Sequence, residues 1–145
     1  MQLDFAFVAD FAQTSAGKIN VIGGGFDKIN AREVPLIYPL MSLVVRLQIS
    51  PAEFGRSHQM EVLVLDEDGQ KIATANGQIR VERPESSQAW RPGGATIALN
   101  FVNLEFKKFG TYAIEIMVNG MSLKSLALDI VPIGGTQVIK PKSIE

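Results

Sequence analysis

The residues that most suggest chemistry are three consecutive glycines at positions 23–25, which follow a β-branched run at 18–22. Glycine-rich turns after a strand can hold phosphate groups on their backbone N–H groups. A dinucleotide-binding fingerprint would need a further glycine where Lys28 stands and then a helix, but the residues that follow favour a strand. The Gly-Lys-Ser/Thr ending of a P-loop is also missing. We therefore expect the triple glycine to form a tight corner or bulge between strands.

His58 is the only histidine, and the chain contains no cysteine. A transition-metal site would therefore depend almost wholly on carboxylates, which suit zinc poorly. As a general base, His58 would need an orienting acid and a nucleophile such as Ser57 or Ser42. Ser57 is its neighbour in sequence, and adjacent residues of a strand point to opposite faces. We expect His58 to be a polar residue at the start of a strand.

The acidic run Asp66, Glu67 and Asp68 raises the question of calcium. An EF-hand loop would place glycine where Lys71 stands and glutamate where Gly77 stands, so the pattern fails twice. The Asp-Gly pair at 68–69 instead predicts the tip of a hairpin. With no catalytic motif intact, we expect no enzymatic activity, no catalytic residues, no metal and no cofactor.

Residues 83–94 form the loosest internal segment and contain Trp90, the only tryptophan. Connections of this length are often either functional or mobile. Trp90 could stack on a sugar ring or a base, anchor a protein contact, or plug the end of the domain. We select Trp90, Arg91 and Arg83 as the residues that contact a partner or ligand.

Composition limits the partners. The 145 residues fit one domain, and 14 basic residues against 15 acidic ones create no overall field for nucleic acid or an anionic membrane. The N-terminus lacks the features of a signal peptide, and no apolar stretch approaches the ~20 residues of a membrane helix. We expect a cytoplasmic protein with no nucleic-acid or membrane partner.

Apolar residues alternate with polar ones through most of the chain, which is the pattern of half-buried strands. We predict an all-β fold, a mostly antiparallel Ig-like β-sandwich with about eight or nine strands and at most one helical turn, at 50–53; a closed barrel is the alternative. The sandwich would occupy residues 1–133, and residues 134–145 would be an extended or disordered tail. Residues 40–49 are the best candidate for a central strand.

Three details of the strands can be tested. Leu3, Phe5 and Phe7 should share one face of the first strand. Residues 36–38, between two prolines, should be extended or at a sheet edge. The Asn-Gly turn at 119–120 should be followed by a β-bulge near 124–125, because only an extra residue there pairs Ile114 with Leu126.

The runs at 8–13 and 17–29, Val-Ala-Asp-Phe-Ala-Gln and Gly-Lys-Ile-Asn-Val-Ile-Gly-Gly-Gly-Phe-Asp-Lys-Ile, resemble the N-terminal signature of a bacterial family of unknown function. The segments at 65–69 and 109–112 are similar to later features of that family, and the resemblance extends to about Val131. It implies a small β-rich domain and offers no catalytic residues to transfer.

The sequence therefore favours a non-catalytic binding or interaction module of the bacterial cytoplasm, with a protein as its partner. One alternative is a module that binds a small ligand, a sugar or a lipid, between the sheets or at the Trp90 loop. The other is a structural component of a larger assembly that pairs through an edge strand at 36–38, which would also allow a homo-oligomer.

Overall fold

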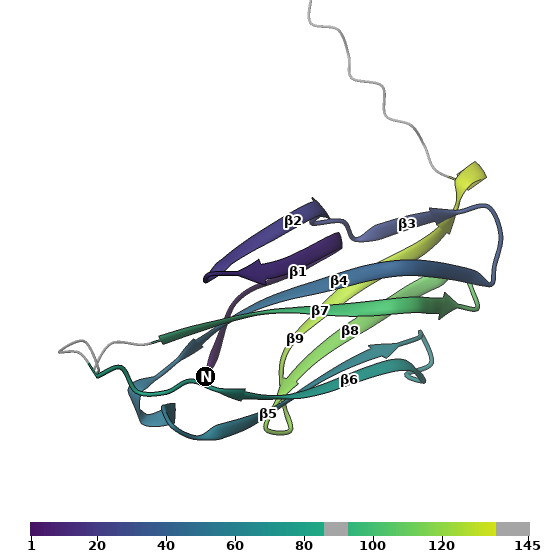
Figure 1. The fold of residues 1–145 in the computed structure, drawn as a ribbon. Coiled ribbons are helices and arrows are strands. Elements are labelled where there is room, and N and C mark those ends of the chain that lie inside the picture. The colour runs from purple at the N-terminus through teal and green to yellow at the C-terminus, as the bar shows by residue number, and fades with distance from the viewer. Residues whose placement is uncertain (86–92, 136–145) are drawn as a thin grey trace, which may run out of the picture.

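The computed structural model describes residues 1–85 and 93–135, and in this part of the chain nine strands form two sheets that face each other (Figure 1). The four-stranded sheet has the order β2-β1-β4-β7, and the five-stranded sheet has the order β3-β9-β8-β5-β6. The elements are β1 (Gln2–Ser15), β2 (Lys18–Gly24), β3 (Lys28–Ala31), β4 (Leu36–Ile49), η1 (Pro51–Glu53), β5 (Ser57–Leu65), β6 (Lys71–Arg80), β7 (Gly93–Phe106), β8 (Gly110–Val118), β9 (Met121–Pro132) and η2 (Ile133–Gly135). The predicted all-β fold is confirmed.

Two short 3-10 turns interrupt the strands. The first, η1, is the predicted helical turn and carries the chain from β4 in one sheet to β5 in the other. The second, η2, follows β9 and had no signal in the sequence. Residues 136–145, most of the predicted tail, lie outside the described residues.

Strand β4 is the central strand that the sequence predicted, with β1 on one side and β7 on the other. Its alternating residues Met41, Leu43, Val45, Leu47 and Ile49 are fully buried. They pack against buried residues of β5 and β8, which are apolar on the facing side. Burial of these side chains between the two sheets is the main source of stability.

The triple glycine forms the predicted corner, and it moves the chain from one sheet to the other. Strand β2 pairs with β1 in the four-stranded sheet, whereas β3 pairs in parallel with β9 in the five-stranded sheet. Gly23 and Gly25 have φ of 62° and 87°, in the left-handed region that favours glycine. A Cβ on Gly23 would lie 2.3 Å from Oδ2 of Asp10, so a side chain there would also force Asp10 to move.

The prediction that Leu3 shares a face with Phe5 and Phe7 is wrong. The pairing of β1 with β4 shifts by one residue between Leu3 and Phe5, which leaves Asp4 as a bulge. Leu3 therefore packs against the main core, while Phe7 packs against a second cluster on the outer side of the sheet. The bulge reverses the side-chain alternation that the sequence pattern implied.

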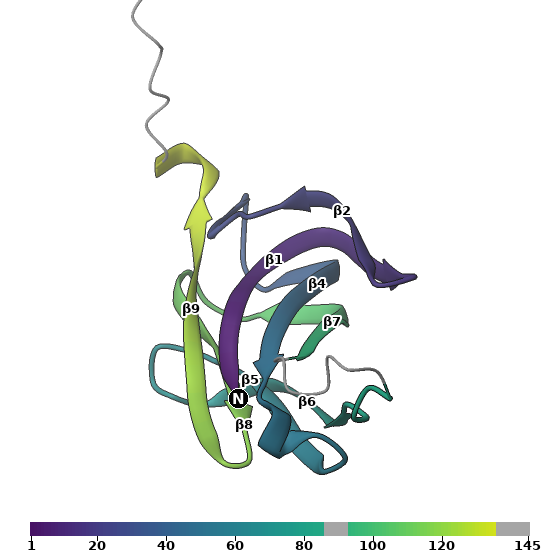
Figure 2. The same cartoon turned by 90° about the vertical axis from the view of Figure 1, so that its left-hand side faces the viewer.

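That second cluster lies under the N-terminal arm, which we define as residues 10–24, the distal part of the β1–β2 hairpin. Figure 2 shows β1 arching above β4, with β2 beyond it. Ala12 and Ile19 of the arm pack with Val44 of β4 and Ala98 of β7. The backbone N–H of Ala12 donates a hydrogen bond of 3.0 Å to Oγ of Ser42, which is fully buried. The arm therefore covers part of the outer face of the four-stranded sheet.

The β-bulge in β9 is confirmed, one residue earlier than predicted. Ile116 pairs with Lys124 and Met117 pairs with Ser122, so the extra residue is Leu123. Beyond the bulge Ile114 pairs with Leu126, as the sequence required.

Residues 36–38 are extended, as predicted, but they do not form an edge strand, which corrects the suggestion that the domain pairs through an edge strand there. They begin the central strand β4, and Leu36 pairs with Phe106 of β7. The edge strands are β2 and β7 in one sheet and β3 and β6 in the other.

Candidate functional site

Of the three predicted contact residues, Trp90 and Arg91 lie outside the residues that the structure describes. Arg83 is exposed, and its Nη2 donates a hydrogen bond of 3.4 Å to the carbonyl of Pro51. The guanidinium therefore lies against the turn η1.

The same turn contacts His58, which is the second residue of β5, near the strand start as predicted, and is buried. Its Nε2 lies 3.2 Å from the carbonyl of Glu53, and its Nδ1 lies 3.0 Å from Nδ2 of Asn119. Oδ1 of Asn119 accepts a hydrogen bond from the backbone N–H of Gln59, so the amide presents its nitrogen to the imidazole. This arrangement fits the tautomer with the proton on Nε2, and it uses both ring nitrogens to hold the turn in place.

The two serines considered as nucleophiles have other positions. Ser42 belongs to the four-stranded sheet, whereas His58 belongs to the five-stranded sheet. The hydroxyl of Ser42 donates to Oδ1 of Asn100 on β7. Ser57 is exposed at the first position of β5. The structure therefore does not bring Ser42 and His58 together.

Glu53 is the most strongly perturbed carboxyl group near this turn. Its partial burial alone would raise its pKa, but the N-terminal ammonium of Met1 and two hydrogen bonds from Ser50 outweigh that effect and lower the pKa to about 2. The ammonium nitrogen lies 2.9 Å from Oε2. The positive charge of Met1 and the negative charge of Glu53 pair with each other, so this contact holds the N-terminus against η1. We call it the clasp at Glu53.

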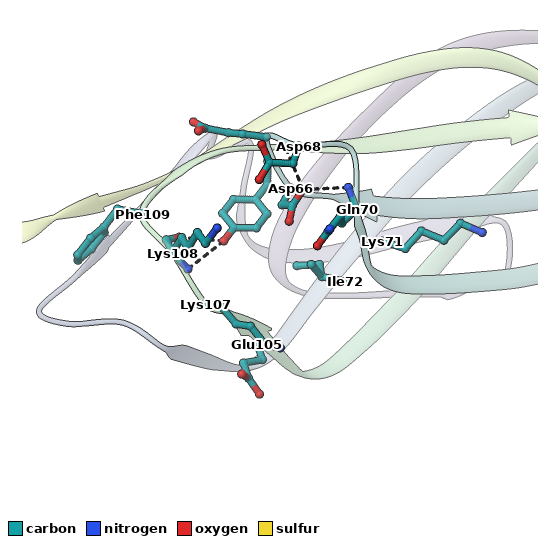
Figure 3. A pocket seen from close by; sticks show the side chains of 11 residues that line it. Asp66, Asp68, Gln70, Lys71, Ile72, Glu105, Lys107, Lys108 and Phe109 are labelled. Carbon is teal, nitrogen blue, oxygen red and sulfur yellow. Dashed lines mark hydrogen bonds between the residues drawn. The ribbon is translucent and has the colours of Figure 1, made fainter.

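A cavity of about 460 Å³ lies at the other end of the domain between the β5–β6 hairpin and the β7–β8 connection (Figure 3). Two of its acidic side chains, Asp66 and Glu67, are engaged in hydrogen bonds to the backbone. Asp66 Oδ1 accepts the backbone N–H groups of Asp68 and Gln70, and Glu67 Oε1 accepts that of Thr111. The predicted hairpin tip is thus confirmed, with its carboxylates serving the turn.

The basic residues of this cavity are Lys71, Lys107 and Lys108. In Figure 3 the side chains of Lys71 and Phe109 extend away from each other at opposite ends of the cavity. The hydroxyl of Tyr112 donates to the carbonyl of Lys108 at 2.8 Å, which ties the connection to β8. The charges of the rim are therefore spread around the opening and do not converge on one ligand atom.

A second hollow lies along one side of the sandwich, between the edge strands β6 and β7. We call it the side groove; its volume is about 350 Å³. It is lined chiefly by apolar side chains of both sheets, Met60, Ala75, Ile79, Ala95, Ile97 and Leu99. The apolar side chains from β7 in this set are only half-buried.

The side groove exists because the inner face of β6 carries very small residues. Ala73, Ala75 and Gly77 lie opposite Val64, Val62 and Met60, so they point into the sandwich. A Cβ on Gly77 would meet no atom within 4 Å. The side chains at positions 75 and 77 of β6 are too short to fill the space beneath β7, so that space stays open.

In the part of the chain that the structure describes, one edge of β7 pairs with no other strand. The strand runs for 14 residues, and no residue from Gly93 to Leu104 is charged. Proteins commonly protect edge strands with charged side chains, prolines or short length, because unpaired backbone groups invite another strand. In β6, Lys71 and Arg80 stand at the two ends. Sequence reasoning missed this site.

No group of three or more His, Cys, Asp or Glu side chains that could hold a metal occurs within residues 1–85 and 93–135. In the same part of the chain, no helix has the length and apolar character needed to span a membrane.

The profile described as "Family of unknown function (DUF6941)" matches residues 4–131, nearly the whole of the two sheets. No curated protein matches the sequence.

Proposed function

The chain belongs to DUF6941, a family of unknown function, and from its fold we propose that it is a non-catalytic interaction module that binds an extended protein segment beside β7. The segment would add a strand to the free edge of β7 and place alternate side chains in the side groove. Backbone hydrogen bonds provide affinity in this mode of binding, and pockets for alternate side chains provide specificity. The observation that carries the proposal is the uncharged edge of β7 above an open apolar groove.

A comparison with the immunoglobulin arrangement supports this position. The order β9-β8-β5-β6 corresponds to strands G-F-C-C′ of that fold, and β1-β4-β7 corresponds to A-B-E. The hydrogen bonds between Tyr112 and the backbone of Lys108 have the form of a tyrosine corner at the start of strand F. We therefore propose an Ig-like sandwich.

In that fold, strand D lies beside strand E, at the free edge of β7. Here residues 81–85, which follow β6, are not in a strand. The described part of the connection thus supplies no strand D, and we propose that the binding partner takes its place.

The sequence of β7 supports the same proposal. A long edge strand with exposed apolar side chains tends to pair with another chain. Strand β7 carries Ile97 and Leu99 on its inner face and Ala98 and Val102 on its outer face. Val102 is 67% exposed. Strand β7 has this character.

A small apolar ligand, such as a lipid chain, is the second candidate. The volume of the side groove lies near the lower limit of known ligand pockets, which begin at about 300 Å³. Its lining offers few polar groups, which disfavours a sugar. For location we propose the bacterial cytoplasm, since small secreted domains commonly use disulfides and this chain has no cysteine.

The substitution Gly77→Val tests the proposal, because its side chain would project into the side groove from a Cβ that meets no atom within 4 Å. Replacing glycine within a strand should stabilise the isolated domain by about 0.5–1 kcal/mol. Random peptides displayed on phage would be selected against the wild-type protein, and the affinity of the best peptide would be measured for each variant. We expect Gly77→Val to lower that affinity by at least about tenfold.

The matched control is Gln78→Val, which adds the same side chain to the exposed face of β6. It should bind the selected peptide as the wild type does. Equal binding by Gly77→Val would contradict the proposal. A loss of stability in Gly77→Val would mean that the chain already fills the groove, which would also contradict it. Titration with an anilinonaphthalene dye tests the lipid candidate. If that candidate is right, the wild-type protein binds the dye and Gly77→Val does not.

A further inference from the structure

We propose that the outer face of the four-stranded sheet carries a binding site for a phosphate group, centred on Arg46 of β4. The site is a hollow of about 220 Å³, which we call the arm-tip hollow because residues 14–17 at the tip of the N-terminal arm line it. Arg46, Gly94 and Thr96 form the rest of its lining. Thr96 and the neighbouring Ala95 of the side groove point to opposite faces of the sheet, so this inference does not depend on the proposed function.

The guanidinium group of Arg46 is held in place by two neighbours. Nη1 donates a hydrogen bond of 2.7 Å to Oγ1 of Thr96, and Nε lies 3.5 Å from Oδ2 of Asp4. A guanidinium group carries five N–H donors in one plane, and these two contacts do not use Nη2. A Cβ on Gly94 would lie 2.3 Å from Nη2, which places this nitrogen beside another residue of the hollow. The protein thus orients two guanidinium nitrogens and presents the third.

The other polar side chains of the hollow carry hydroxyl groups. Thr14 and Ser15 bring theirs from the arm, and Thr96 brings its own from β7. Because Oγ1 of Thr96 accepts the bond from Arg46, its hydroxyl proton can be donated to a ligand. Among the described residues, no carboxylate and no large apolar side chain lines the hollow.

This set of donors matches a phosphate group. One guanidinium and three hydroxyl groups come from three strands, and they suit the several oxygens of a phosphate better than the two oxygens of a carboxylate. The hollow is smaller than the ~300 Å³ at which pockets for whole small molecules begin, so it fits a single group. Affinity for free phosphate should be modest, because Asp4 neutralises part of the charge and the Arg46 side chain is 38% exposed.

Nuclear magnetic resonance of the isotope-labelled protein provides the test. Inorganic phosphate would be titrated at constant ionic strength, with chloride and acetate as the comparison anions. We expect saturable shifts of the backbone signals of residues 14–17 and of Thr96 with phosphate, weaker ones with acetate and none with chloride. Titration with phosphoserine identifies the source of the group. Tighter binding than that of inorganic phosphate would indicate a phosphate ester, and equal or weaker binding would indicate free phosphate.

Two matched pairs of variants separate charge from geometry. Arg46→Gln should weaken phosphate binding by at least about tenfold, whereas Arg32→Gln, the same change at an exposed residue outside the hollow, should not. Gly94→Ala keeps every charge, but its Cβ would displace Nη2, so it should also weaken binding. Gly77→Ala adds the same methyl group where no atom lies within 4 Å, and it should bind phosphate as the wild type does.

Three results would overturn the proposal. The first is an equal response to phosphate and chloride, and the second is binding of acetate as strong as that of phosphate. The third is phosphate binding that Arg46→Gln or Gly94→Ala leaves unchanged. The dispersion of the amide signals would verify that each variant is folded.

Discussion

At the scale of single residues, the clasp at Glu53 couples the fold to pH. Its folded-state pKa of about 2 lies below its ordinary value of 4.5, so the carboxylate stabilises the fold above pH 4.5 and this contribution is lost as the pH falls toward 2. Replacement by Gln should remove about 1 kcal/mol at neutral pH, since the group lies near the surface and is partly screened. Thermal unfolding between pH 2 and 6 would show a shallower acid loss in Glu53→Gln. Parallel curves for the two proteins would contradict the clasp.

The corner glycines allow a second prediction. Gly23→Ala should destabilise the domain by more than the 1–2 kcal/mol that left-handed backbone costs a residue with a side chain, because the new Cβ also meets Asp10. Gly17→Ala is the control, since Gly17 has a similar φ of 75° with no atom within 4 Å of a Cβ. Urea unfolding of both variants would isolate the steric part. Equal losses of stability in the two variants would mean that Asp10 moves away from the new Cβ at no cost.

At the scale of elements, the N-terminal arm depends on few polar contacts. The hydroxyl of Tyr38 donates a hydrogen bond of 2.9 Å to Oδ1 of Asp10, and burial together with this carboxylate raises the pKa of Tyr38 to about 12. Tyr38→Phe should cost about 1 kcal/mol and loosen the arm before the rest of the domain. Hydrogen exchange should quicken at residues 10–24 and stay unchanged in β8. Uniform acceleration across the domain would contradict a separately anchored arm.

The core strands give a larger and simpler effect. Ile114 of β8 is fully buried, and Ile114→Ala should cost about 2–4 kcal/mol through lost burial and the resulting cavity. Ile37→Ala is the matched control, because Ile37 is 57% exposed, and it should change stability by less than about 0.5 kcal/mol. Chemical denaturation would compare the two. A loss below about 1 kcal/mol in Ile114→Ala would contradict its central place in the core.

Elements with strong alternation could be predicted from the sequence, and irregular ones could not. The central strand β4 and the bulge in β9 followed from side-chain pairing, which permits a single register once one face is buried. The bulge at Asp4 carried no such signal, since Leu3, Phe5 and Phe7 are apolar on either face. The start of β4 was misjudged because Pro35 and Pro39 indicated an edge, whereas its partner β7 lies far along the chain.

At the scale of the whole molecule, the candidate site arises because the small residues of β6 in one sheet do not fill the space beneath β7 of the other. Small residues on β6 matter only because β7 faces them, and nothing in either segment alone reveals that neighbour. The sequence pointed instead to Trp90 and Arg91, which lie outside the described residues, and to Arg83, which contacts η1. An unfilled space between distant strands is a property of the assembled fold, so composition and spacing could not predict it.

The crossing at the glycine corner also has a consequence for synthesis on the ribosome. Strand β3 emerges early, yet Lys28 pairs with Asp129 and Ala31 pairs with Pro132 of the last strand. The five-stranded sheet cannot close until β9 has left the exit tunnel, and contacts between such distant segments form slowly. During that interval the growing chain holds an unpaired early strand. We expect a chaperone that acts on nascent chains to bind β3 during that interval.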